Sequence, residues 1–256
     1  MTLGYGIDVS RHQEPALLPW AAWSGQVDFV ISRAGYGRTL DRRSAEHVAR
    51  ARGIGAKVGL YLFFRVVESI DDQLENLKTA ARWCGVGDRD IVPALDIEND
   101  LERHVEPSWS EHAEQLAQRI VDSFGNCLVY CTQADWRKLG APAWLLRRPL
   151  WAPHWTLAAT PATPGGIPAT LWQHRVGPFE RDGAGGPYDH TGAACRPGQQ
   201  PEGIDQNRQL LPFPLIGQVV TQDERDRIEA MVLNSLADEA RRVGAGEPFP
   251  LPEEDA

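Results

Sequence analysis

The sequence has 256 residues, 42% of them hydrophobic and 24% charged, a composition that excludes a mainly disordered chain and allows a large buried core. The formal net charge of −9 gives little attraction for nucleic acid phosphates or anionic lipid, so we expect no nucleic acid partner. No apolar run approaches the ~20 residues that span a bilayer, and no basic and apolar leader follows Met1. We therefore expect neither membrane insertion nor a signal peptide.

Short apolar segments alternate with helix-like segments along the first 150 residues, a pattern typical of a parallel sheet covered by helices. The expected strands lie at 4–9, 29–34, 58–64, 91–98, 127–132, 150–155, 170–174 and 203–207. Several of them are apolar throughout rather than alternating, as expected for strands that are covered on both faces.

Helices are expected at 44–52, at 69–84 with Ser69 as N-cap, and at 110–124 with Ser110 as N-cap. Pro and Gly crowd the chain after about residue 150, so we expect loops rather than helices between the last strands. The pattern predicts an α/β fold, an incomplete TIM-like barrel that lacks its last helices. An open doubly wound sheet is the alternative.

Two parts of the chain differ in character: residues 1–213 form the predicted barrel, and residues 214–256 form an extension that holds ten acids and four arginines. The extension is expected to contain a helix at 221–243, followed by a disordered acidic tail. This helix either docks on the barrel or forms an oligomer or partner contact.

The cysteines are too few and too scattered for a disulfide framework, and we expect Cys84, Cys127, Cys131 and Cys195 to be buried free thiols. Cys127 and Cys131 fall on one expected strand, where their Cα atoms lie ~13 Å apart, too far for a bridge. No His or Cys cluster has the spacing of a metal site, so we expect neither metal nor cofactor.

Four acids stand at expected strand ends: Asp8, Asp96, Glu98 and Asp205. In a parallel barrel the active site lies at the carboxyl ends of the strands. Asp96 and Glu98 are two residues apart and therefore point to the same face of their strand. Crowding of carboxylates raises the pKa of at least one of them, as a general acid near neutral pH requires. The alternative for an isolated Asp-x-Glu pair is a solvated strand end.

Rings and one buried cation accompany these acids, and the expected substrate contacts are Arg33, Tyr36, Tyr61, Phe64, Trp151 and Trp172, with Trp155 close by. For any single ring a place in the core is the alternative. Arg33 is costly to bury, so we expect it to pair with one of the acids, for either a functional or a structural reason. Paired carboxyl groups in an aromatic cleft fit the cleavage of a glycosidic bond.

Five segments in order resemble the motifs of glycoside hydrolase family 25, the Chalaropsis-type lysozymes or N-acetylmuramidases. They are Gly6-Ile-Asp-Val-Ser-Arg-His-Gln13, Phe29-Val-Ile-Ser-Arg-Ala-Gly-Tyr-Gly37, Pro93-Ala-Leu-Asp-Ile-Glu98, Leu171-Trp-Gln173 and Gly203-Ile-Asp-Gln-Asn207. The resemblance spans about residues 4–210 and departs from the family pattern at Leu62 and His174.

This resemblance implies a (β/α)5(β)3 barrel that hydrolyses the β-1,4 bond between N-acetylmuramic acid and N-acetylglucosamine in peptidoglycan. It implies that Glu98 is the general acid/base and that Asp96, Asp8 and Asp205 are the other acids of the cleft. Either a carboxylate or the substrate's N-acetyl oxygen attacks the sugar, and both routes retain the anomeric configuration. We favour the N-acetyl oxygen, oriented by Asp96 or Asp205.

Two other functions stay open: a non-catalytic cell-wall-binding or virion structural module on the same fold, and a chitinase-like glycosidase. Ala94 stands where a chitinase-like strand would carry a further acid, which argues against the latter. A leaderless wall hydrolase is expected to be made in the cytoplasm and released by lysis, through a phage route or with a virion. Export by a specialised bacterial route is the alternative.

Overall fold

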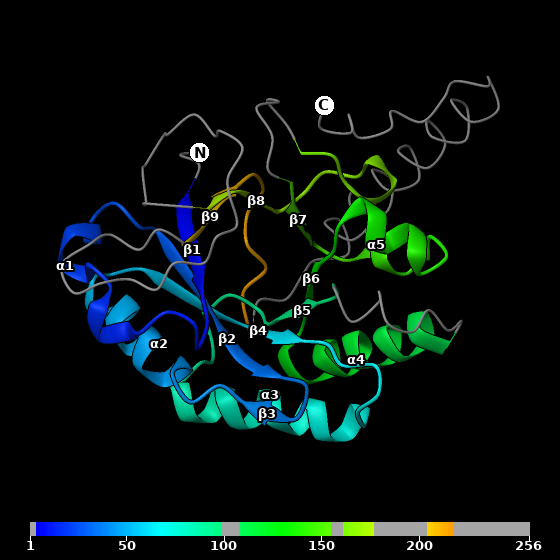
Figure 1. The fold of residues 1–256 in the computed structure, drawn as a ribbon, viewed down its shortest axis with the longest axis horizontal. Helices are drawn as coiled ribbons and strands as arrows, with labels where there is room; N and C mark the ends of the chain where they lie inside the picture. Colours follow the sequence, from blue (N-terminus) through cyan, green and yellow to red (C-terminus); the bar gives the residue numbers. More distant parts are fainter. Residues whose placement is uncertain (1–3, 99–107, 155–160, 177–203, 218–256) are drawn as a thin grey trace.

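The computed structural model describes residues 4–98, 108–154, 161–176 and 204–217. In these residues eight strands form a closed barrel (Figure 1), because β1 pairs with both β2 and β9. The strands are β1 (Tyr5–Val9), β2 (Phe29–Tyr36), β4 (Lys57–Phe63), β5 (Ala94–Asp96), β6 (Leu128–Tyr130), β7 (Leu150–Pro153), β8 (Leu171–Val176) and β9 (Asp205–Gln209). A short strand, β3 (Thr39–Leu40), pairs with β2 outside the ring. The barrel was predicted correctly, and the open sheet is excluded.

The last strand departs from the parallel sheet that the sequence predicts. Strand β9 is antiparallel to both β8 and β1, whereas the other strands of the ring are parallel. An antiparallel strand brings its first residue to the barrel edge at which the parallel strands end. Asp205 opens β9 and is the register partner of Asp8. The reversed strand therefore still delivers its acid to the predicted edge.

Strand β5 is shorter than the expected 91–98 because Pro93 has no N–H to donate to a ladder. Ile91 instead pairs with Leu215, which follows β9. The N–H of Val92 donates to the carbonyl of Pro214 at 3.0 Å. Residues 214–216 therefore pair with the barrel, so the expected boundary between residues 213 and 214 falls inside a packed segment.

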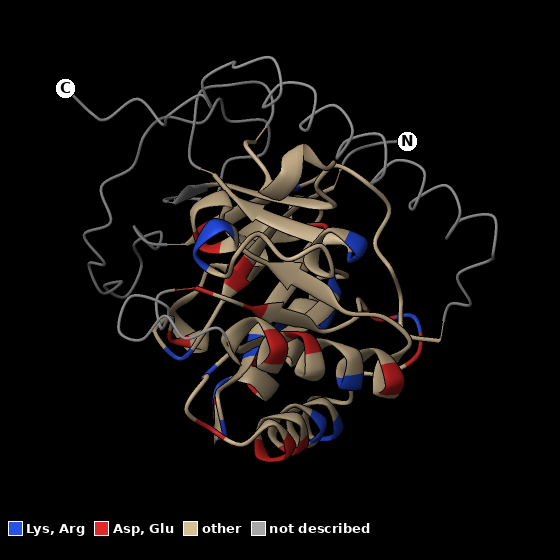
Figure 2. Cartoon of the chain, turned by 90° about the vertical axis from the view of Figure 1, so that its right-hand side faces the viewer, with Lys and Arg blue, Asp and Glu red and all other residues tan. Residues whose placement is uncertain are grey.

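Helices cover the outside of the barrel between successive strands (Figure 1), and acidic and basic residues are interspersed along them (Figure 2). They are α1 (Trp20–Trp23), α2 (Ser44–Gly53), α3 (Ile70–Cys84), α4 (Ser108–Phe124) and α5 (Gln133–Lys138). Short 3-10 turns lie at η1 (Pro15–Leu17), η3 (Leu145–Arg147) and η4 (Pro164–Gly166). None of the helices in the described ranges is long and apolar enough to cross a membrane.

One predicted helix cap is confirmed and one is wrong. The Ser69 hydroxyl accepts from the N–H of Asp72 at the start of α3. Helix α4 begins at Ser108, so Ser110 lies inside it. The Ser110 hydroxyl accepts instead from the indole N–H of Trp144 at 3.1 Å. It therefore links α4 to the segment before β7.

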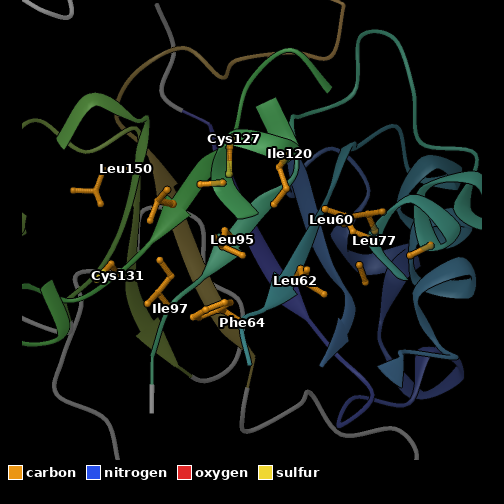
Figure 3. Packing of buried hydrophobic residues seen from close by; sticks show 14 of the residues in the cluster. Leu60, Leu62, Phe64, Leu77, Leu95, Ile97, Ile120, Cys127, Cys131 and Leu150 are labelled. Carbon is orange, nitrogen blue, oxygen red and sulfur yellow. The ribbon is translucent and has the colours of Figure 1, made fainter. Parts of the chain in front are cut away.

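The core has two layers because alternate residues of each strand face opposite sides. A helix-facing layer includes Leu60, Leu62, Phe64 and Leu95 (Figure 3). The barrel interior is filled by Phe29, Ile31, Ile91, Val92, Ala94, Leu128, Tyr130, Trp151, Leu171 and Phe213. Phe213 stacks edge-on against Phe29 at the first residue of β2, with ring centroids 4.8 Å apart. The interior is thus packed at the end opposite the strand-end acids.

The position of Gly6 depends on this packing. A Cβ atom on Gly6 would lie 2.4 Å from the Phe29 ring, closer than non-bonded carbons approach. Only glycine lets β1 pass the ring and continue to Asp8 two residues later.

Truncation of Leu95, which is fully buried in the helix-facing layer, is expected to leave a cavity. The Leu95→Ala variant should lose about 2–5 kcal/mol of unfolding free energy, measured by urea denaturation. Val67→Ala is the matched control, because Val67 is 68% exposed. The control should stay within about 0.5 kcal/mol of the wild type. Equal losses in both variants would contradict this account of the core.

Cys84, Cys127 and Cys131 are buried free thiols, as predicted. Cys195, Trp155 and the helix expected at 221–243 lie outside the described residues.

Candidate active site

The four predicted acids meet at one end of the barrel. Asp8 is the fourth residue of β1, Asp96 ends β5, Glu98 follows it by two residues, and Asp205 opens β9. Asp8 and Asp96 are buried, while Glu98 and Asp205 are half-buried. The charges of these acids raise one another's pKa values. The carboxyl groups therefore share one poorly hydrated site.

Asp8 is held by two side-chain amides. Its Oδ2 accepts from Gln173 Nε2 at 2.9 Å and from Asn207 Nδ2 at 2.7 Å. Burial raises the pKa of Asp8 to about 6, while these two donors act in the opposite direction by stabilising the carboxylate. Asp8 is thus buried but provided with donors for its charged form. Gln173 and Asn207 each end one of the five sequence motifs, and the motifs alone predict no role for either side chain.

Asp96 has no comparable support. Its Oδ1 atom is buried and has no hydrogen-bond partner in the described part of the chain. Burial, followed by the charges of Glu98 and Asp8, raises the pKa of Asp96 well above its usual range. Burial and the charges of Asp8 and Glu98 also raise the pKa of Asp205 well above the ordinary value. Both groups are therefore biased toward the neutral form.

Glu98 has the pKa that general acid catalysis requires. Burial first, then the charges of Asp135 and Asp8, raises it to about 7. A carboxyl group with this pKa is substantially protonated at neutral pH and can donate a proton to a leaving oxygen.

Asp135 is an acid of the site that the sequence analysis missed. It lies in the first turn of α5, directly after β6, and is buried. The Thr132 hydroxyl accepts from the Asp135 N–H at 2.9 Å and donates to its Oδ2 at 2.6 Å. The sequence signal was available, because Thr132-x-x-Asp135 has the spacing of a helix-capping motif after a strand.

Arg33 does not pair with any of the four predicted acids, so that expectation was wrong. Its Nε donates to Asp41 Oδ2 at 3.0 Å, and both side chains are buried. Asp41 also accepts from the backbone N–H of Arg11 at 2.8 Å. The ion pair therefore ties β2 to the loop that follows β1. The positive charge of Arg33 still lowers the pKa of Asp96, although burial and the neighbouring acids outweigh it.

Two predicted aromatic contacts lie on the side of the acids. Tyr61 of β4 is half-buried, and burial followed by the charge of Asp8 raises its pKa. Tyr36, also half-buried, stacks on Phe63 with ring centroids 4.6 Å apart and lies under the Arg65 guanidinium at 4.5 Å. The register shift between Arg33 and Gly35 in β2 pairs Tyr36 with Phe63, whose other register partner is Asp96.

The other three predicted rings, Phe64, Trp151 and Trp172, are buried. Phe64 is buried in the helix-facing layer, opposite Tyr61 and Phe63, because it is one residue out of their phase. Trp172 is buried beside the inward-facing Gln173, and its indole N–H donates to the His154 carbonyl at 2.6 Å. Trp151 lies in the barrel interior and is only 1% exposed. For these rings the structure favours the core alternative.

The sequence matches the family model described as "Glycosyl hydrolases family 25" over residues 7–177. The chain belongs to glycosyl hydrolase family 25. It is therefore a glycoside hydrolase, and the acids at the barrel end are the candidate groups for its chemistry. A search of curated proteins found no match. Within the described residues no cluster of His, Cys, Asp and Glu side chains is arranged to hold a metal ion.

Solved structures of several wall-lytic enzymes share the fold of this chain. The bacterial lysozyme from Streptomyces coelicolor is 21% identical with a TM-score of 0.62, over 92% of this chain and 99% of that one. The Clostridium perfringens spore cortex lytic enzyme SleM is 18% identical with a TM-score of 0.64, over 84% and 69%. The catalytic domain of endolysin ply40 from a Listeria monocytogenes bacteriophage is 17% identical with a TM-score of 0.57, over 89% and 98%. At these identities the similarity shows a shared fold.

Proposed function

We propose that this family 25 member is a peptidoglycan hydrolase, an N-acetylmuramidase that cleaves the β-1,4 bond between N-acetylmuramic acid and N-acetylglucosamine with retention. The observation that carries the proposal is the divided acidity of the site. Glu98, with a pKa of about 7, supplies the proton, while Asp8, with a pKa of about 6 and two amide donors, supplies a negative charge. Asp8 has two amide donors that stabilise its charged form, and Glu98 lies in the same site with a raised pKa, an arrangement suited to a charged partner and a proton donor.

In the first step Glu98 donates its proton to the glycosidic oxygen, and the C1–O bond breaks. The substrate's N-acetyl oxygen bonds to C1 from the opposite face and gives an oxazolinium ion. Glu98, now ionised, takes a proton from a water molecule as the water oxygen attacks C1. This attack opens the oxazolinium ring and restores the N-acetyl group, and the two inversions at C1 together retain the configuration. Direct attack by a carboxylate is the alternative.

The other acids have different assignments in this scheme. Asp8 is the carboxylate that stabilises the positive charge developing near C1. Asp96 and Asp205, whose pKa values are raised by burial and by the neighbouring acids, orient the acetamido group by hydrogen bonds. Tyr36 and Tyr61 are the rings that contact sugar faces. Arg33 acts through its positive charge, which lowers the pKa of Asp96.

The decisive experiment identifies the sugar at the new reducing end. Peptidoglycan digested by the purified protein is reduced with borohydride and hydrolysed, and the sugar alcohols are separated. Muramitol is the expected product. Glucosaminitol would instead show that the protein cleaves the neighbouring glycosidic bond of the strand, on the other side of N-acetylglucosamine. Binding to insoluble peptidoglycan without new reducing ends would favour the non-catalytic wall-binding module. Cleavage of chitin oligomers alone would favour the chitinase-like alternative.

The Asp135→Asn variant is expected to move the alkaline limb of the pH–rate profile to lower pH. Glu98 must be protonated to act as the acid, so the rate falls as the pH rises through its pKa. Removal of the Asp135 charge lowers that pKa, while asparagine still accepts from the Thr132 hydroxyl. Asp122→Asn, on the exposed face of α4, is the control. An unmoved limb in Asp135→Asn would show that Asp135 does not act on Glu98.

We further propose that the barrel is the (β/α)5(β)3 form. Helices follow β1, β2, β4, β5 and β6 in the described residues, whereas only the turn η4 lies between β7 and β8 there. Residues 1–213 are the proposed catalytic unit, to which residues 214–216 pair. We propose that the rest of the extension, to residue 256, contains a helix that contacts the barrel, a second copy or a partner. The substrate places the site of action at the bacterial cell wall, reached by lysis, by a phage route or with a virion.

A further inference from the structure

The side-chain amides of Gln173 and Asn207, which donate to Asp8, each accept a hydrogen bond from an aromatic side chain. Tyr130 OH donates to Gln173 Oε1 at 2.9 Å, and Trp151 Nε1 donates to Asn207 Oδ1 at 2.7 Å. These four side chains lie in the barrel wall and interior and are all buried. Two hydrogen-bonded arms therefore converge on one oxygen of Asp8, each with an aromatic donor at its outer end.

We propose that Tyr130 and Trp151 are positioning residues for Asp8. They fix the orientation of the two amides so that both NH2 groups, rather than the carbonyl oxygens, face the carboxylate. The inference rests on the proposed function, in which Asp8 acts as the charged partner of Glu98.

An amide side chain has a donor end and an acceptor end of nearly equal size. An unrestrained Asn207 can rotate by half a turn and present Oδ1 to Asp8. The indole N–H of Trp151 can only donate, so of the two ends of the Asn207 amide it can bond only to Oδ1. Rotation would leave a buried donor unpaired and set two oxygens against each other, both of which are costly.

The two arms differ in strength. A tyrosine hydroxyl both donates and accepts, so Tyr130 can adapt to a rotated Gln173, whereas Trp151 cannot adapt to a rotated Asn207. Ring packing limits the movement of both donors: Tyr130 and Trp151 meet edge-on at 4.9 Å, and Tyr61 meets Trp151 at 6.0 Å. We therefore expect loss of the Trp151 donor to have the larger effect.

The same geometry explains the burial of Trp151, a ring that the sequence placed in the sugar cleft. At 1% exposure the ring offers no face to a ligand, but its nitrogen reaches the amide that touches Asp8. Its role is therefore exerted through Asn207.

The test compares Trp151→Phe and Tyr130→Phe with the wild type. Tyr130→Phe removes one oxygen and keeps the ring, so the packing is preserved. This variant therefore still tests the proposal if Trp151→Phe does not fold. Trp144→Phe is the matched control, because its indole N–H donates to Ser110 Oγ on the outside of the barrel. Each variant is assayed for kcat, KM and the pH dependence of kcat on peptidoglycan fragments.

We expect kcat to fall about three- to ten-fold in Trp151→Phe and less in Tyr130→Phe, with KM little changed. Asp8 must be ionised, so the rate rises as the pH passes its pKa. Loss of the fixed donors raises that pKa and moves the acidic limb of the profile to higher pH. Neither substitution removes a charge, because burial keeps Tyr130 neutral by raising its pKa well above the ordinary value.

Other charged and titratable groups also share the surroundings of Asp8. They are Arg33 of β2, Tyr61 of β4, Asp96 and Glu98 at the end of β5, Tyr130 of β6 and Asp205 of β9. A direct measurement separates Asp8 from them: the carboxyl carbons of 13C-labelled aspartate are titrated by NMR, and Asp8→Asn assigns the Asp8 signal.

An upward shift of the Asp8 titration in both aromatic variants, but not in Trp144→Phe, supports the positioning role. A lower kcat with an unmoved Asp8 titration overturns it, as does an equal shift in the control. A wild-type protein that does not cleave peptidoglycan overturns the proposed function instead. In that case the NMR titration still decides whether the two aromatic residues position Asp8.

Discussion

The Glu98→Gln variant is expected to release reducing ends from peptidoglycan about 2 to 4 orders of magnitude more slowly than the wild type. The amide has nearly the shape of the acid but no proton to give to the leaving oxygen. Binding should persist, because the substitution keeps the polar atoms at position 98 and removes only the acid function. The measurement is the initial rate of reducing-end release at the pH optimum, together with affinity for insoluble peptidoglycan.

The control for this variant is Glu111→Gln, in the first turn of α4 on an exposed surface. It removes the same functional group from a position outside the acid site and should retain the wild-type rate. If Glu98→Gln cleaves as fast as this control, Glu98 is not the general acid. Loss of wall binding along with activity would point to misfolding, which the unfolding transition of the variant would reveal.

Strand positions and acid positions could be predicted because both have local causes. Apolar runs that end in a polar residue mark buried strands, and Asp8 and Asp96 stand at such ends. The spacing in Asp96-Ile-Glu98 brings both acids toward one end of the barrel without any knowledge of the fold. The cap at Ser69 likewise depends only on the next three residues.

The direction of β9 and the partner of Arg33 have no such local signal. A strand has the same two-residue period whether it is parallel or antiparallel, so 203–207 is predicted as a strand without an orientation. Arg33 and Asp41 are eight residues apart and meet only because the chain turns back through β3. Because charge was the only criterion available from the sequence, each of the four predicted acids was an equally good partner for Arg33.

Aromatic rings were the least predictable part of the site. Phe63 and Phe64 are adjacent in sequence, and a shift of one residue in the phase of β4 decides which of them faces the acids. Trp151 was expected to contact the substrate, but it lies in the barrel interior, where tertiary packing leaves it only 1% exposed. A ring at a strand end is compatible with both a cleft and a core, and only the neighbouring strands decide between them.

The Asp8→Asn variant tests the other half of the divided acidity. Asparagine keeps an oxygen that accepts from Gln173 and Asn207, so the local packing should survive, but the negative charge is lost. Removal of one preorganised electrostatic contact to a transition state typically slows catalysis about 10²–10³-fold. We expect kcat to fall by that amount, and the acidic limb of the pH–rate profile to disappear because the group that must ionise is gone.

A second consequence of Asp8→Asn concerns Glu98. The Asp8 charge contributes to the raised pKa of Glu98, so the alkaline limb should move to lower pH, in the same direction as in Asp135→Asn. A carboxylate that acted only as a structural hydrogen-bond acceptor would leave the acidic limb in place when replaced by its amide, although the loss of its charge would still move the alkaline limb. Retention of the acidic limb in Asp8→Asn would therefore exclude Asp8 as the ionised partner and transfer that role to Asp96 or Asp205.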